Sequence, residues 1–413
     1  MNAVMTTNEL WATQRQPINI ARREFRANPF PFYAWLREEH PVYKARMGRT
    51  DVWLVTRYDD VVAVLKDERF VKNQANIKQP SQRKSAQWVP GFLKPLTTNM
   101  LDQDDPNHAR LRALVHKAFT PARVEEMSAN IQQIVGTLLD RATTRTSMDL
   151  VNDFALQVPL TVISELMGVV EGDRLRFHRW VKAMLQPPSD LLTLLAIPTF
   201  WRAIRFLRQL IVERRAHPGD DLLSALVQAE EAGERLDEDE LLGMAMILLI
   251  AGYETTVNLI ASGTLALLQN PEQMTLLRAE PALMRSAIEE IVRFTDPVSE
   301  ATERYASQEV TLAGVTIPSG GLTLAVLASA NRDKHCFEQP DSFDIRRQKN
   351  RHLGFGHGIH YCVGAPLARL EGSIALNALL QRLPNLQLAV PAEKLRWRST
   401  PMLRGLESLP VTF

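Results

Sequence analysis

The order of hydrophobic and polar residues predicts a mainly helical chain. Several stretches of helix-forming residues carry a start signal, such as an acid, threonine or proline in the first turn, or a proline just after the last turn. The predicted helices span residues 28–39, 58–66, 151–167, 173–184, 197–215, 237–269, 282–294 and 365–382, and two more open at Asp105-Pro106 and Thr120-Pro121.

Shorter apolar runs predict a smaller β region. Residues 42–46 and 52–57 are rich in β-branched and aromatic side chains around Gly48, which predicts a hairpin. Strand-like runs follow at 302–306, 310–312, 315–317 and 322–328, and the tail at 386–413 alternates enough to predict short strands. From 71 to 100 the chain loses periodicity, and a loop this long is typically functional or disordered.

The helix at 237–269 is the longest predicted element. Asp237 at the cap and Glu240 three residues later form its start signal. Its segment 241–268 is apolar and long enough, at ~1.5 Å per residue, to cross a bilayer. Polar residues lie at its centre, however, where a carboxylate in lipid is costly: Glu254, Thr255, Thr256 and Asn258. We therefore interpret it as a buried core helix, with a local opening favoured by Gly252 and the threonines.

Composition narrows the class of protein. The 413 residues include 48 basic and 47 acidic ones, for a net charge of +1, so no overall charge favours nucleic acid. Two cysteines, Cys336 and Cys362, are too few for a disulfide scaffold and are too widely spaced for a metal finger. Residues 1–16 show neither a signal peptide nor a membrane anchor. A cytoplasmic protein that binds no membrane is expected.

The stretch from Phe355 to Gly364 carries the most specific chemical signal. Three glycines in ten residues let the backbone turn tightly and approach a flat partner. Cys362 follows the turn and precedes a helix N-terminus, which favours a thiolate. A thiolate beside a flat surface suits the axial position of haem iron. A buried structural cysteine is the alternative for an isolated Gly-x-Cys.

The full spacing Phe-Gly-x-Gly-x-His-x-Cys-x-Gly closely resembles the haem-binding loop of the cytochrome P-450 superfamily, the haem-thiolate monooxygenases. Within this family, the expected lack of a membrane anchor in residues 1–16 favours the soluble bacterial type. The resemblance makes Cys362 the axial iron ligand and places His360 on a haem propionate. His108 and Arg112 match the family's His-x-x-x-Arg, and Arg304 matches its third propionate-binding cation. The implied cofactor-binding residues for haem b are His108, Arg112, Ala251, Gly252, Arg304, Gly354, Phe355, Gly356, His360, Cys362 and Gly364.

An acid followed by an alcohol, Glu254-Thr255, resembles the family's oxygen-activation signature. Splitting dioxygen needs two protons delivered through a hydroxyl and an acid rather than through bulk solvent. Glu254 stands where the most familiar bacterial members carry aspartate. The alternative to an oxygen-activation role is that Glu254 and Thr255 are only a polar site in a buried helix.

Three further residue sets have expected roles. Glu290, which lies 72 residues before Cys362, shares a helix face with Arg293, and the two would form a structural charge triad with Arg347. Glu300 and Thr302 can contact a substrate hydroxyl or serve structural roles. The candidate substrate-pocket residues are Trp88, Phe92, Leu96, Met100, Leu192, Pro297, Val298, Ala301, Met402 and Leu403.

The resemblance covers most of the chain and implies the triangular, mainly helical P-450 fold with a long central helix over the haem. We expect one domain over 1–413, with 1–28 as an N-terminal extension, acting as a monomer. The expected function is insertion of one oxygen atom from O2 into a C–H bond, by hydroxylation or epoxidation, of an apolar small molecule. Electrons would come from NAD(P)H through ferredoxin reductase and ferredoxin.

Arg346, Arg347, Lys349 and Arg351 with Arg110 and Lys117 can supply a basic face on which ferredoxin docks, and a solvated charged surface is the alternative. A peroxygenase that uses hydrogen peroxide is one alternative function, although its relatives lack the acid–alcohol pair. A haem-binding sensor without turnover is another.

Overall fold

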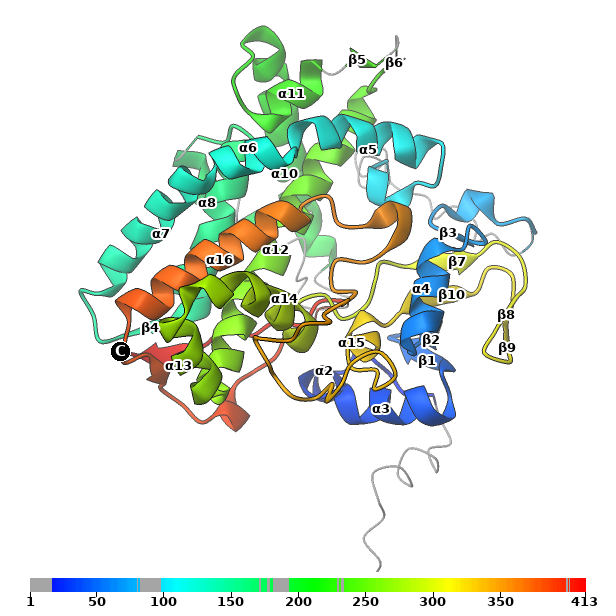
Figure 1. Cartoon of the computed structure of the whole chain (residues 1–413). Helices are drawn as coiled ribbons and strands as arrows, with labels where there is room; N and C mark the ends of the chain where they lie inside the picture. The colour runs from blue at the N-terminus through cyan, green and yellow to red at the C-terminus, as the bar shows by residue number, and fades with distance from the viewer. Residues whose placement is uncertain are drawn as a thin grey trace, which may run out of the picture. The chain divides into compact units, whose positions relative to one another are not determined.

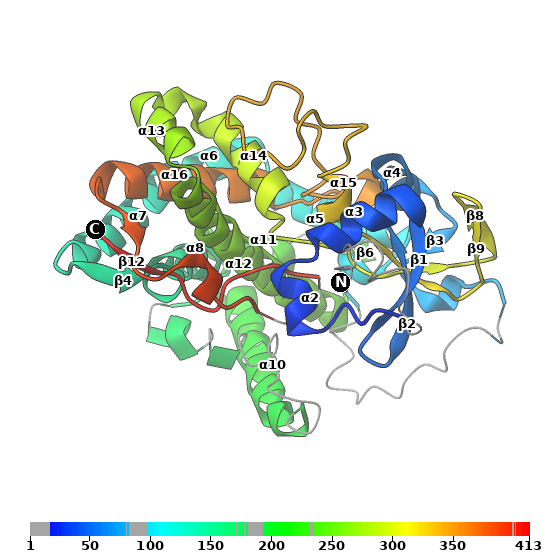
Figure 2. The same cartoon turned by 90° about the horizontal axis from the view of Figure 1, so that it is seen from below.

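The structure is a computed structural model that describes residues 17–79, 81, 98–170, 172–176, 179–180, 193–228, 230–231, 234–398, 400 and 402–413. Contacts divide the chain into two compact units. The first takes in the described residues of Met1–Ser85, Ala261–Cys362 and Gln387–Leu409, and the second those of Ala86–Ile260, Val363–Leu386 and Pro410–Phe413. Figures 1 and 2 label the elements of both units. The single domain over 1–413 stays a prediction.

A five-stranded sheet organises the first unit, in the order β1-β2-β10-β7-β3. The predicted hairpin is confirmed: β1 (Val42–Met47) pairs antiparallel with β2 (Thr50–Val55). β10 (Leu322–Ala325) runs parallel to β2, and β7 (Arg304–Ala306) pairs antiparallel with both β10 and β3 (Phe70–Val71). A separate hairpin joins β8 (Val310–Leu312) to β9 (Val315–Ile317).

Two hydrophobic clusters cover this sheet. One contains Phe32, Tyr33 and Leu36 of α3 (Phe30–Glu39) with Val52 and Leu54 of β2. The other contains Val61, Val64 and Leu65 of α4 (Tyr58–Lys66) with Val55 and Ala325. Alternate strand residues therefore face α3 and α4, as the period of two in a strand requires. Figure 1 shows both helices beside the strands.

The first unit contains further helices that carry or support the predicted site residues. They are α2 (Arg23–Ala27), α13 (Pro271–Ala279), α14 (Met284–Thr295), α15 (Leu327–Ala330) and the C-terminal end of α12. Short 3₁₀ turns lie at Gln74–Asn76, Pro281–Leu283, Gly358–His360 and Ala392–Lys394, and a short strand, β11, at Gln387–Leu388. The predicted strand at 322–328 is wrong in its second half, where residues 327–330 are helical. In a short, fully buried apolar run, periodicity does not distinguish a helix from a strand.

The second unit is mainly helical. Its helices are α5 (Asn107–Ala118), α6 (Pro121–Glu126), α7 (Ser128–Ala142), α8 (Gln157–Leu166), α10 (Thr193–Ala216), α11 (Leu222–Gln228), most of α12 (Glu238–Gln269) and α16 (Ala365–Arg382). A 3₁₀ turn lies at Met100–Asp102, β4 (Ser147–Asp149) pairs with β12 (Pro410–Thr412), and β5 (Glu230–Glu231) pairs with β6 (Glu234–Arg235). Both views show α7 and α16 side by side.

The predicted helix at 151–167 is two elements. Residues Leu150–Ala155 form a π-helical turn, and α8 begins only at Gln157. The Asp149 carboxylate accepts a hydrogen bond from the Val151 N–H at 3.1 Å and starts the turn, a local cap that apolar periodicity does not report.

The start signal of α12 is confirmed as a reciprocal capping box. The Glu240 N–H donates to Asp237 Oδ1 at 2.7 Å, and the Asp237 N–H donates to Glu240 Oε2 at 3.2 Å. Among the described helices, α12 alone is long and apolar enough to cross a membrane, and 72% of its apolar window is buried inside the protein. A buried core helix has these properties.

Candidate active site

The backbone around Cys362 is fixed by positive φ angles that favour glycine. Gly356 has a φ of 74° and Gly358 a φ of 72°. A Cβ at Gly358 would lie 2.6 Å from the backbone oxygen of Leu65, so a side chain there would displace α4. The Cys362 N–H donates to the Phe355 carbonyl at 2.9 Å and closes the turn. The loop therefore holds the cysteine backbone in one position.

The same loop is packed against α14. A Cβ at Gly354 would lie 2.4 Å from Cγ1 of Val292, so the loop approaches that helix as closely as glycine permits. The side chain of Asn331 accepts the Leu353 N–H at 2.7 Å. Cys362 itself is exposed and forms no disulfide, although cysteine is among the most buried residue types in proteins. A rigidly held, exposed thiol fits the axial ligand of a haem.

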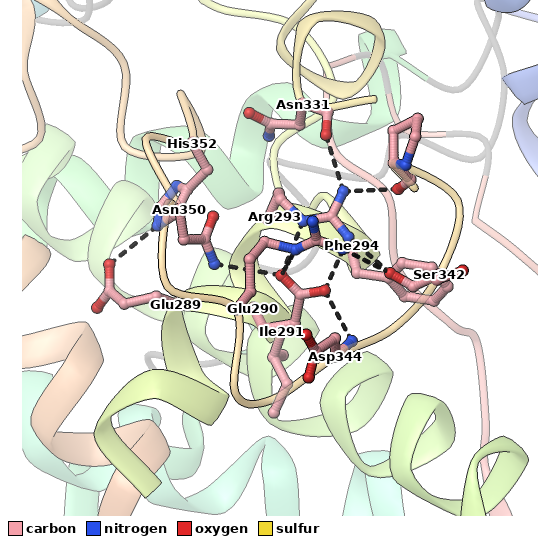
Figure 3. A network of polar contacts seen from close by, with 12 residues as sticks. Glu289, Glu290, Ile291, Arg293, Phe294, Asn331, Ser342, Asp344, Asn350 and His352 are labelled. Atoms are coloured by element: carbon pink, nitrogen blue, oxygen red, sulfur yellow. Dashed lines mark hydrogen bonds and ion pairs between the residues drawn. The ribbon is translucent and has the colours of Figure 1, made fainter. Parts of the chain in front are cut away.

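The predicted charge triad is assembled around Glu290, and Figure 3 shows Glu290 beside Arg293. The Arg293 guanidinium donates to both Glu290 oxygens at 2.8 Å, and Arg347 Nε donates to Oε2 at 3.0 Å. Arg293 also donates to the carbonyls of Asn331, at 2.9 Å, and Ser342, at 3.0 Å. Arg293 and Glu290 are completely buried. The cluster thus joins α14 to the segment between α15 and the cysteine loop.

Arg304 and His360, two predicted propionate ligands, lie in the first unit. Arg304 begins β7 with 3% of its surface exposed, and its guanidinium donates to the Thr302 carbonyl at 3.2 Å. His360 ends the 3₁₀ turn Gly358–His360, two residues before Cys362.

The other predicted propionate ligands lie on α5 in the second unit. His108 is buried, and its Nδ1 lies 3.2 Å from Oδ1 of Asp105. Burial lowers the pKa of the His108 imidazole, against the opposing effect of Asp105. Arg112 stands one turn further along the helix.

The acid–alcohol pair lies on α12. Glu254 is buried, whereas Thr255 is half-buried and Ala251 is exposed on the same helix. The Thr255 hydroxyl donates to the Ala251 carbonyl at 2.8 Å, and the Thr256 hydroxyl donates to that of Gly252 at 3.3 Å. Both threonine hydroxyls therefore contact backbone carbonyls of their own helix. The predicted local opening is absent, because α12 is helical throughout.

Five of the candidate pocket residues come together in the first unit. Val298 forms an antiparallel bridge with Leu403, and the Ser299 N–H donates to the Met402 carbonyl at 2.8 Å. Pro297 and Ala301 belong to the same segment as Val298. Met100 lies in the second unit, where its N–H contacts Sδ of Met244. Trp88, Phe92, Leu96 and Leu192 fall outside the described residues.

The second unit also contains a cavity of about 630 Å³ among the described residues, unrelated to this chemistry. The ends of α10 and α11 and the start of α12 line it, and no predicted site residue contributes to its wall.

Sequence reasoning missed several buried polar contacts made over long separations. Glu300 accepts from Arg26 Nη1, at 2.7 Å to Oε2, and from the Tyr33 hydroxyl at 2.8 Å. Residue 26 therefore packs into the first unit, although 1–28 was expected to be an extension. Lys72 is buried and donates to the Thr302 hydroxyl. Glu300 and Thr302 thus have structural partners. No local sequence pattern signals such pairs.

Three residues of the predicted basic face are paired with carboxylates. Arg346 pairs with Glu280, Arg347 with Glu290 and Arg110 with Glu240. Lys349 and Arg351 stay exposed. The side chain of Lys117 falls outside the described residues.

Comparison with known proteins identifies the family. The model of the family described as cytochrome P450 matches residues 17–386, a range that contains the whole cysteine loop. The chain belongs to the cytochrome P450 family. It is 46% identical to cytochrome P450 107B1 of Saccharopolyspora erythraea, over 92% of this chain and 93% of that one. It is also 46% identical to the cytochrome P450 monooxygenase PikC of Streptomyces venezuelae, over 94% and 92%.

Solved P450 structures share the fold. The cytochrome P450 PksS of the Bacillus subtilis bacillaene polyketide synthase superposes with a TM-score of 0.89 at 42% identity, over 96% of this chain and 99% of that one. The P450 fold is therefore confirmed, with its small sheets and long helix α12. As a P450, the chain is a monooxygenase that acts on small molecules, and the family implies a haem held by a cysteine thiolate.

Proposed function

We propose that this P450 inserts one atom of O2 into a C–H bond of an apolar small molecule, with electrons from NAD(P)H delivered by ferredoxin reductase and ferredoxin. The observation that carries this proposal is the exposed Cys362 on its glycine-fixed loop. Haem b, bound through this thiolate, supplies the chemistry that cleaves dioxygen and oxidises carbon.

The chain's own residues would hold the cofactor and manage protons. Arg304, His108, Arg112 and His360 would bind the two propionates, because cationic donors stabilise carboxylates. The Thr255 hydroxyl is held by its bond to Ala251, and its oxygen can accept a second hydrogen bond. Buried Glu254 is the proposed proton source.

The pocket segment supports an apolar substrate. The backbone bonds between residues 298–299 and 402–403 place apolar side chains of Val298, Met402 and Leu403 in one region of the first unit. Relatives include a 6-deoxyerythronolide B hydroxylase, a vitamin D(3) 25-hydroxylase and a myxobacterial P450 in complex with myristic acid. A macrolide aglycone, a secosteroid and a fatty acid therefore form the first panel of compounds.

The proposal is tested by measuring coupling with the compound that shifts the ferric iron to high spin. Thr255→Ala should lower product formed per NAD(P)H by an order of magnitude or more and release peroxide, because the hydroxyl oxygen that would accept a hydrogen bond in the proton-delivery path is lost. Thr256→Ala is the matched control, since it removes a similar backbone-bonded hydroxyl one residue away. Equal coupling in wild type and Thr255→Ala would refute the role of Thr255.

A further inference from the structure

The side chain of Asn331 forms hydrogen bonds in two directions within the first unit. Its Oδ1 accepts the Leu353 N–H at 2.7 Å, and its Nδ2 donates to Oδ1 of Asp296 at 3.0 Å. A backbone N–H can only donate, so the bond to Leu353 fixes the amide orientation and turns the nitrogen toward the carboxylate. Asn331 and Asp296 are completely buried, and only 2% of Leu353 is exposed. Loss of either bond would therefore leave a buried polar group unsatisfied.

Leu353 begins the cysteine loop, residues 353–362, which ends at the predicted iron ligand. Its carbonyl accepts the Gly356 N–H at 2.7 Å, and the Phe355 carbonyl accepts the Cys362 N–H at 2.9 Å. The bond from Leu353 to Asn331 is thus the first of a series of hydrogen bonds that leads to the cysteine. Asn331 holds the start of this loop.

Asp296 begins the wall segment, residues 297–301, which contains three of the candidate pocket residues. It ends α14 in the left-handed region, with a φ of 50° and a ψ of 63°. Aspartate tolerates this region better than most residues, but a residue before a proline prefers extended backbone, and Pro297 follows. Oδ2 of Asp296 has no hydrogen-bond partner among the described residues. The Asn331 amide therefore supplies a side-chain hydrogen bond that holds a strained turn.

The backbone of Asn331 is fixed by other bonds. Its N–H donates to the Leu327 carbonyl at 2.8 Å and closes α15, and the Ala328 N–H of the same helix donates to the Ser299 carbonyl at 2.9 Å. The Asn331 carbonyl accepts from Arg293 of the charge triad at 2.9 Å (Figure 3). Because its backbone is held, the side chain of Asn331 keeps the wall segment and the cysteine loop at a set separation.

We propose that Asn331 is a positioning residue that couples the wall segment to the cysteine loop. This inference rests on the proposed function, since it takes Cys362 as the iron ligand. A substrate that displaces the wall segment would move Asp296, and the Asn331 amide would pass the displacement to Leu353, because chains of buried hydrogen bonds carry coupling between sites. A change at the cysteine loop would act on the wall segment in return, since coupling is reciprocal.

The test is amide hydrogen exchange of the haem-loaded, full-length protein at neutral pH, followed by mass spectrometry. Asn331→Asp keeps an acceptor for the Leu353 N–H but cannot donate to Asp296, so only the bond toward the wall segment is lost. Exchange in the wall segment should be ~10- to 100-fold faster than in wild type, the range for one hydrogen bond to a charged group. Exchange in the cysteine loop should rise by at least ~5-fold, the lower end of typical coupling energies.

Exchanging the two side chains is the matched rescue. In Asp296→Asn/Asn331→Asp, the amide at 296 can donate to the carboxylate at 331, which still accepts the Leu353 N–H. Both segments should therefore return to wild-type exchange. Asp296→Asn alone keeps the oxygen acceptor and should speed exchange in neither segment. Peptides from α7, in the second unit, control for global unfolding, which would speed their exchange equally.

The ferrous–carbon monoxide spectrum gives a second readout. In moderate urea, Asn331→Asp should lose the thiolate-dependent Soret band faster than wild type, and the exchanged pair should not. If Asn331→Asp folds poorly, Asp296→Gly replaces it, because it removes the carboxylate, suits the positive φ and leaves the bond to Leu353 intact. It too should speed exchange in the cysteine loop.

Three results would overturn the proposal: faster exchange confined to the wall segment, equal acceleration in α7, or a cysteine loop that the exchanged pair does not restore. A wild-type protein without the thiolate-dependent band would instead refute the proposed function. The exchange rates of that protein and its variants would still decide whether Asn331 couples the two segments.

Discussion

Glu371 offers the sharpest prediction about stability. It lies on the buried stripe of α16 between Leu367 and Ala375, each four residues away, and is only 2% exposed. Its Oε2 has no hydrogen-bond partner among the described residues. Burial alone raises the pKa of this carboxyl from 4.5 to about 8.

The sign of the pH effect follows from that direction. Because the pKa is higher in the folded state, the stabilisation is fully present below pH 4.5 and is lost as the pH rises through 8. Each pH unit between 4.5 and 8 lowers the free energy of unfolding by about 1.4 kcal/mol. The pKa difference of about 3.5 units therefore corresponds to a loss of at most about 5 kcal/mol.

Glu371→Gln removes the titrating group with little change of shape. The variant should therefore gain free energy of unfolding relative to wild type as the pH rises from 5 to 8, with a constant difference above 9. Urea unfolding of both haem-loaded proteins, followed by circular dichroism at each pH, measures this difference. A difference that does not change with pH would show that the carboxyl ionises normally and would refute the reasoning.

Three further predictions concern the charge triad, a second buried acid and the redox partner. Arg293→Lys should lower the free energy of unfolding by roughly 2–3 kcal/mol, because lysine cannot reproduce the forked contacts of arginine with Glu290. Arg346→Lys, at an exposed ion pair, should change it by less than about 0.5 kcal/mol. Urea unfolding compares the two variants, and equal losses would contradict the structural role of Arg293. Burial raises the pKa of the Asp296 carboxyl from 3.8 to about 6, so the stability that its protonated form gives is lost as the pH rises between these values. The Asp296→Asn variant should therefore be about 3 kcal/mol more stable than wild type above pH 6 but not at pH 3.5. A difference in stability that does not depend on pH would count against this prediction. Ferredoxin-driven turnover should fall as salt rises while dithionite reduction does not, and turnover insensitive to salt would argue against electrostatic docking.

Local signals predicted the elements whose boundaries depend on neighbouring residues. The helix limits at 58–66 and 365–382 agree with α4 and α16, and the capping box at Asp237 and Glu240 is formed. The glycine spacing before Cys362 likewise anticipated a turn that requires positive φ. In each case the physical cause lies within a few residues of the element.

Contacts across long separations could not be predicted in this way. Arg26 meets Glu300 over 274 residues, and Lys72 meets Thr302 over 230. The same limit hid the carboxylate partners of Arg346, Arg347 and Arg110, because the sequence gives charges and not their partners. Residues 327–328 were predicted as strand because a fully buried helix turn shows no alternation.

The most direct test of the central claim is the absorption spectrum of the dithionite-reduced protein with carbon monoxide, compared among wild type, Cys362→Ala and Cys336→Ala. Neither cysteine forms a disulfide, so the second variant is a matched control. A strongly red-shifted Soret band in wild type and Cys336→Ala that is absent from Cys362→Ala is the predicted result. Persistence of the band in Cys362→Ala, or its absence from haem-replete wild type, would contradict the assignment of Cys362 as the iron ligand.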